Sequence, residues 1–129
     1  MKKIIALLSV AIFAAAFFAF AAEDTKPELR PAQKVMQARV AWLAAINKNL
    51  GAKNFEAVAK DANELSAQTK RVGENLTNPL GKELDLAISL LAKDVSAAAA
   101  KKNGDVVKVK LGEIKAKCGE CHAKIRDKK

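Results

Sequence analysis

The sequence of 129 residues predicts an all-α protein, an antiparallel four-helix bundle. Apolar residues recur with the helical period of about 3.6 in four stretches beyond residue 22. Glycine, asparagine or proline separates these stretches, and no segment shows the alternation of a half-buried strand. Because the connections are short, successive helices are expected to be neighbours that run in opposite directions.

Residues 1–21 have the features of a signal peptide. Lys2 and Lys3 precede an apolar run that only Ser9 interrupts, and Ala19-Phe20-Ala21 fits a cleavage site. An uncleaved anchor is the alternative, because the run is long enough to span a bilayer. Residues 22–129 then form one exported domain, which predicts a periplasmic protein with no membrane span in its mature form.

The first two predicted helices span residues 28–50 and 53–72. The first ends before Gly51. Its apolar stripe, which we expect in the core, has Leu29, Met36, Leu43 and Leu50 at every seventh position, with Ala32, Val40 and Ile46 alongside. The stripe of the second is Phe55, Val58, Ala62, Leu65, Thr69 and Val72. Residues 73–77 are expected to form a loop.

The other two helices begin at capping residues. Asn78 is an N-cap followed by Pro79 at the first helical position, and Asn103-Gly104 is a stop. The third stripe is Leu80, Leu84, Ala87, Ile88, Leu91, Val95 and Ala98. The fourth helix is expected to start at Asp105 as cap. Its face is Val107, Leu111, Ile114, Cys118, Cys121, His122 and Ile125.

The composition excludes several classes of function. His122 is the single histidine, so a His-based catalytic pair and a multi-His metal site are excluded. No nucleophile–base or carboxylate pair can be placed together, so we expect no enzyme. Beyond residue 22 only Trp42 and Phe55 are aromatic, a thin set of core residues that suggests help from outside the polypeptide.

Cys118-Gly119-Glu120-Cys121-His122 is the strongest signal in the chain. Cys-x-x-Cys-His is the pattern of covalent haem attachment. Cysteines three residues apart lie on one helix face and can form thioethers with the two vinyl groups of one porphyrin, and the histidine can reach the iron. A zinc site needs four ligands where the chain offers three. A dithiol redox pair is typical of a helix N-terminus, and a structural disulfide leaves His122 without a role.

With this motif near its C-terminus, the chain resembles the class II cytochromes c, the cytochrome c′ and cytochrome c-556 family. The resemblance is most specific over residues 118–126, where Arg126 is the basic residue four after the histidine. It implies one haem c attached through Cys118 and Cys121, His122 as axial ligand of the iron, and Arg126 as a further cofactor-binding residue. It leaves a homodimer open.

The family divides on the sixth coordination position of the iron. The resemblance to the c-556 group implies that Met36 binds there, whereas a c′-like protein is five-coordinate and Met36 is then core packing. Arg39 reaches a haem propionate or is solvated.

Two main functions follow as expectations. The first is a one-electron carrier with His122 and Met36 as axial ligands; the alternative is a five-coordinate protein that binds small gases such as NO or CO. A purely structural bundle with a disulfide is the third. The net charge of +9 concentrates in residues 101–129, and export and the lack of interleaved aromatics argue against nucleic acid. Lys115, Lys117, Lys124 and Arg126 are expected to steer an acidic redox partner.

Overall fold

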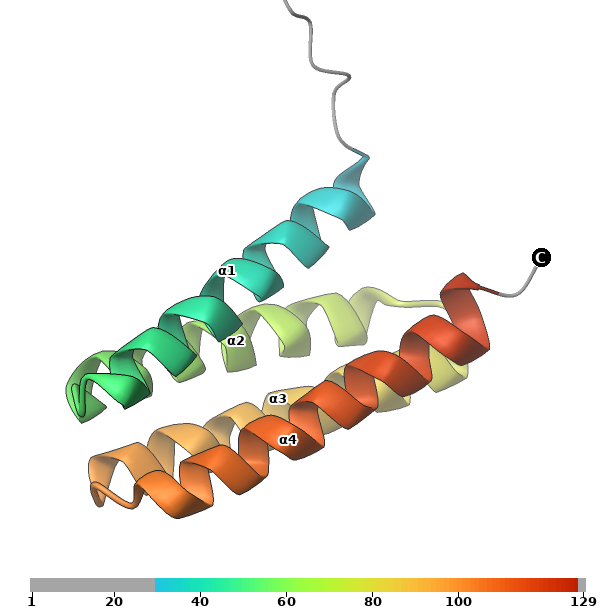
Figure 1. Cartoon of the computed structure of the whole chain (residues 1–129). Coiled ribbons are helices and arrows are strands. Elements are labelled where there is room, and N and C mark those ends of the chain that lie inside the picture. Colours follow the sequence, from blue (N-terminus) through green and yellow to red (C-terminus); the bar gives the residue numbers. More distant parts are fainter. Residues whose placement is uncertain (1–29, 128–129) are drawn as a thin grey trace, which may run out of the picture.

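The computed structural model describes residues 30–127, so the predicted signal peptide and Leu29 lie outside the described residues. The elements are α1 (Pro31–Gly51), α2 (Phe55–Asn75), α3 (Pro79–Ala100), α4 (Gly104–Cys121) and the π-helical turn η1 (His122–Arg126). Successive helices are joined at alternating ends (Figure 1). The prediction of an all-α four-helix bundle is confirmed. Residues 30–127 contain no strand, and none of their helices is long and apolar enough to cross a membrane.

Asparagine side chains cap three of the helices. Asn78 accepts a hydrogen bond from the backbone N–H of Gly81 at 2.9 Å, as predicted for the start of α3. The cap of α4 is Asn103, which accepts from Val106 N at 3.2 Å. The prediction of Asp105 as cap is therefore wrong: Asp105 lies in the first turn, where its charge favours the positive end of the helix.

The second helix continues through most of the predicted loop. Gly73 is buried inside α2, and a Cβ atom at this position would lie 3.0 Å from the Cβ of Asp85 on α3. The glycine therefore allows α2 and α3 to approach closely, and this pair has the most extensive helix packing in the bundle. The packing holds α2 helical as far as Asn75, where the sequence suggested a turn.

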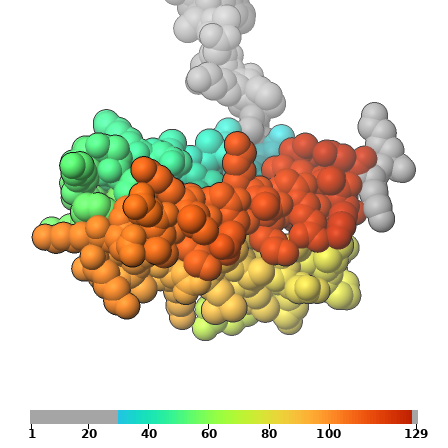
Figure 2. All heavy atoms as spheres, turned by 60° about the horizontal axis from the view of Figure 1, so that its bottom comes forward, coloured from blue at the N-terminus to red at the C-terminus, as the bar shows by residue number. Residues whose placement is uncertain are grey.

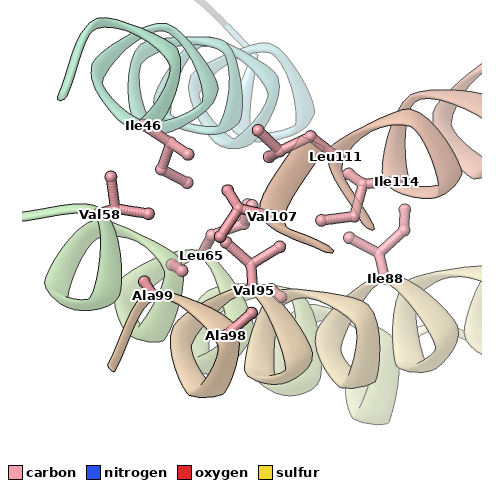
Figure 3. Packing of buried hydrophobic residues seen from close by; sticks show 12 residues of the cluster. Ile46, Val58, Leu65, Ile88, Val95, Ala98, Ala99, Val107, Leu111 and Ile114 are labelled. Carbon is pink, nitrogen blue, oxygen red and sulfur yellow. The ribbon is translucent and has the colours of Figure 1, made fainter. Parts of the chain in front are cut away.

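The apolar core receives side chains from all four helices (Figure 3). Its buried members are Ile46, Val58, Ala62, Leu65, Ile88, Ala92, Val95, Ala98, Ala99, Val107, Leu111 and Ile114. Most of them come from the end of the bundle where α1 and α3 finish and α2 and α4 begin. This end is therefore held by apolar packing, and the predicted stripes of α2, α3 and α4 supply most of it.

Buried polar side chains extend from the middle of the bundle toward its opposite end. They are Ser66, Gln68 and Thr69 of α2, Asp85 and Ser89 of α3, and Arg39 of α1, and the apolar Leu84 is buried among them. Ser66 Oγ lies 2.8 Å from the carbonyl oxygen of Ser89, and Ser89 Oγ donates to the carbonyl of Ser66 at 2.9 Å. Every buried side-chain nitrogen and oxygen of the described residues has a hydrogen-bond partner, so these polar side chains are fully paired.

The first helix packs chiefly on α2, and its N-terminal half leans away from α4 (Figure 1). Its only buried residues are Arg39 and Ile46. The predicted stripe is confirmed at Ile46, which is fully buried, and at Leu43 and Leu50, which pack half-buried against the core. It is wrong at Met36 and Val40, which are 36% and 66% exposed. A helix that contacts one main neighbour buries a narrower stripe than its apolar pattern suggests.

Candidate functional site

Cys118, Cys121 and His122 lie at the junction of α4 and η1. Cys118 and Cys121 belong to the last turn of α4, and His122 begins η1. All three are half-buried, and they continue the buried face of α4 toward the C-terminal end of the bundle. Of the three, Cys118 packs against the apolar core. On the side shown in Figure 2, α4 crosses between α1 and α3, with this segment in its red end.

Both cysteines are free thiols, and the fold favours their protonated form. Burial is the main cause that raises the pKa of Cys118, and it also raises the pKa of Cys121. Among the charged neighbours, Arg39 lowers both pKa values and Asp85 raises both. Thiols of this kind are weak nucleophiles at neutral pH, which argues against a dithiol–disulfide redox centre.

A buried polar network lies beside these thiols. The guanidinium of Arg39 donates to both carboxylate oxygens of Asp85, each at 2.8 Å, and its Nε donates to Gln68 Oε1 at 3.0 Å. Gln68 Nε2 in turn donates to the backbone carbonyl of Val35 at 3.3 Å. The network joins α1, α2 and α3, so the interpretation of Arg39 as a solvated residue is wrong.

Asp85 and Gln68 are site residues that the sequence did not predict. A signal for Asp85 was present, because it falls between Leu84 and Ile88 on the apolar face of the third helix. A charged residue on such a face is seldom buried without a partner of opposite charge. Arg39 lies between polar and apolar positions of the first helix, and nothing local in the sequence pairs it with Asp85.

Met36 lies on α1 one turn before Arg39, in the half of α1 that is at the same end of the bundle as the C-x-x-C-H segment (Figure 1). Its side chain is 36% exposed and belongs to no core cluster of the described residues. Met36 lies on the first helix, as expected. It is not buried in the core, although the sequence predicted that it would be.

A π-helical turn begins at His122, directly after Cys121. The backbone N–H of Asp127 donates to the carbonyl of His122 at 2.9 Å, the five-residue spacing of a π-helix. Within this turn, the Cδ1 of Ile125 lies 3.4 Å from the position that a Cβ of Gly81 would occupy. Ile125 thus rests on the start of α3, which anchors the segment that carries His122.

The basic residues of this end are partly neutralised by neighbours. Lys117 and Lys124 both pair with Glu120, at 3.2 and 2.7 Å, and these hydrogen bonds lower the pKa of Glu120. Arg126 is exposed and pairs with the adjacent Asp127 at 2.6 Å. Lys115 is exposed as well.

The donor set suits a cofactor that brings most of its own ligands. Within residues 30–127, no three His, Cys, Asp or Glu side chains converge on a point where they could hold a bare metal ion. A haem needs only one or two axial ligands from the protein, because the porphyrin supplies four nitrogens. One half-buried histidine beside two free thiols fits that requirement.

Comparisons of the chain with protein-family models, with curated proteins and with solved structures return no match.

Proposed function

We propose that the chain is a periplasmic monohaem c-type cytochrome that carries one electron at a time. The observation that carries this proposal is the placement of Cys118, Cys121 and His122 on one half-buried helix face. That face lies at the end of the bundle that has fewer buried apolar side chains. A large flat cofactor held there would supply the apolar volume that the side chains of this end do not.

The two thiols have the chemistry that covalent attachment requires. Each thiol would add its S–H across one vinyl group, so that a sulfur–carbon bond forms and the proton goes to the neighbouring vinyl carbon. This addition needs no oxidant. A bound haem then supplies reversible exchange of one electron.

His122 and Met36 are the residues proposed to bind the iron. The imidazole of His122 directly follows the second cysteine, and Ile125 anchors its segment on α3. Met36 would approach from α1 as a neutral thioether ligand, which favours the ferrous state and raises the reduction potential. In the proposal, Arg126 stays a cofactor-binding residue that would have to leave or share its pairing with Asp127.

The exposure of Met36 favours a second candidate function. A side chain that is 36% exposed on a helix that leans away from α4 is not held in a ligating position by packing. If Met36 does not bind the iron, His122 is the sole axial ligand and the open position can take a small gas. The protein is then a five-coordinate gas-binding protein.

Absorption spectra and the mass of the purified chain test these proposals. We expect a protein that keeps its haem in denaturant, with its mass increased by one haem. The variant Cys118→Ala/Cys121→Ala is the control and should lose covalent haem while His122 is retained. A wild-type chain without covalent haem, produced together with attachment machinery, would refute the proposal.

A comparison of the wild type with Met36→Leu separates the two candidates. For the electron carrier we expect a low-spin ferrous spectrum in the wild type, and a high-spin spectrum with faster carbon monoxide binding in Met36→Leu. Identical spectra in the two proteins would exclude Met36 as ligand and favour the gas-binding protein.

The proposed partner is an acidic redox protein. The excess of positive charge in residues 101–129 would raise the encounter rate by long-range attraction. Since Glu120 pairs with Lys117 and Lys124, the steering charge near the haem-binding segment depends more on Lys115 than the sequence alone suggests. Transfer rates should fall as ionic strength rises.

A further inference from the structure

The first helix has one buried side chain in each half. Ile46 points into the apolar core from the C-terminal half (Figure 3), where Trp42, Leu43 and Leu50 pack against the same core. In the N-terminal half, the only buried side chain is that of Arg39. The two halves of α1 are therefore attached by different chemistry, apolar packing in one and polar bonds in the other.

The polar attachment fixes both a side chain and the backbone of α1. Two hydrogen bonds tie Arg39 to Asp85 on α3, and a third ties it to Gln68 on α2. Gln68 also donates to the carbonyl of Val35, the residue before Met36. Such bonds are directional, so they define the position of the helix more narrowly than apolar contacts do.

We propose that this clamp of Arg39, Asp85 and Gln68 positions residues 31–42 of α1 opposite the C-x-x-C-H segment and thereby sets where Met36 lies. The consequence for Met36 rests on the proposed function, whereas the mechanical role of the clamp does not. In this role Arg39, Asp85 and Gln68 are positioning residues.

The burial of the clamp explains why it can act as a positioning device. Arg39 and Asp85 are 5% and 3% exposed. Without the carboxylate charge, the guanidinium would be buried and unpaired, and the N-terminal half of α1 would gain free energy by moving outward until Arg39 is hydrated. The apolar core around Ile46 would keep the C-terminal half in place. The helix would then open from its N-terminal end.

Hydrogen exchange of the purified full-length protein, in the form in which it is produced, tests the clamp. In Asp85→Asn, we expect the amides of residues 34–42 to exchange about tenfold faster or more than in the wild type. The amides around Val58 and Val107 should keep wild-type rates. Asp85→Glu retains the charge and should restore part of the protection.

Ile46→Ala is the matched control, because it weakens the other attachment of the same helix. It should loosen residues 43–51 and the core without selective exchange in residues 34–42. The proposal would be overturned if residues 34–42 kept wild-type protection in Asp85→Asn. It would also be overturned if their exchange rose only in step with the whole bundle.

The absorption spectrum of the haem gives a second test, because a purely structural role of the clamp would leave this spectrum unchanged. If Met36→Leu alters the ferric spectrum, Asp85→Asn should shift the spectrum in the same direction, and Ile46→Ala should keep the wild-type spectrum. A wild-type spectrum in Asp85→Asn would overturn the role of the clamp toward Met36. A purified protein without haem would refute the proposed function alone, because the exchange experiment decides the clamp without a cofactor.

Discussion

Arg39 of α1 and Asp85 of α3 form a buried ion pair in which each terminal guanidinium nitrogen donates to a different carboxylate oxygen at 2.8 Å. Their side chains are 6% and 5% exposed, and the pair spans 46 residues of sequence. The loss of hydration offsets much of the attraction in such a pair. We therefore interpret it as a determinant of how α1 is placed rather than as a large net source of stability.

A double-mutant cycle should show this balance. Arg39→Met and Asp85→Leu each leave one buried charge unpaired, and each should lower the free energy of unfolding by about 3–5 kcal/mol. The double variant should recover most of that loss, because two apolar side chains replace the pair. Urea unfolding followed by Trp42 fluorescence and circular dichroism measures the three values. Losses that simply add in the double variant would contradict the interpretation.

The two glycines Gly73 and Gly112 should respond to alanine with opposite signs. At Gly73 a new Cβ would lie 3.0 Å from the Cβ of Asp85, so α2 must shift from α3, at a cost of about 1–3 kcal/mol. At Gly112 a Cβ would have no atom within 4 Å, so Gly112→Ala should stabilise α4 by about 1 kcal/mol. Chemical denaturation of both variants checks the prediction. Equal effects would show that the α2–α3 contact is not tight at Gly73.

Alkylation of the thiols should be slow in folded, haem-free protein. Burial raises the pKa of Cys118 above its ordinary value of 9.0, so little thiolate exists at neutral pH. Because the folded pKa is raised, this group's contribution to stability is complete below pH 9 and is lost as the pH rises through the folded pKa. Iodoacetamide labelling against pH, with a denatured sample as reference, measures the shift. A folded-state rate equal to that of the denatured sample would contradict it.

The two ends of the bundle should differ in stability when no haem is attached. The few aromatics suggested a core that needs help from outside the polypeptide, and the apolar core is concentrated at the end that contains Ile46 and Val107. In Cys118→Ala/Cys121→Ala we expect residues 31–42 and 115–126 to lose hydrogen-exchange protection first. The core at the other end should stay protected. Uniform exchange along all helices would show that the bundle opens as a single unit.

Features that depend on local chemistry could be predicted well. The Asn78 cap with Pro79 behind it needs only neighbouring residues, so the start of α3 follows from the sequence. The end of α2 could not be predicted in this way, because Gly73 favours a turn locally. The helix continues there since that glycine allows the backbone of α2 to approach α3, a contact between segments distant in sequence.

The same distinction between local features and contacts of distant segments applies to the candidate site. The spacing of Cys118, Cys121 and His122 places them on one face of any helix, so their proximity follows from helical geometry. The burial of Arg39 does not follow, because its partner Asp85 lies on another helix. The exposure of Met36 was missed for the same reason: an apolar heptad indicates a face, but the number of neighbouring helices decides how much of it is covered.

By itself the sequence determined the four helices, most of their boundaries and the shared face of the C-x-x-C-H segment, because helical period and capping act over a few residues. Only the tertiary structure decided that the buried residues are mostly apolar at one end of the bundle and more often polar toward the other. It also decided that Arg39 crosses to Asp85 and that α1 leans away from α4 at the end that carries Met36. These features depend on which helices meet and how closely, and that is set by the total packing free energy of the bundle rather than by any local pattern.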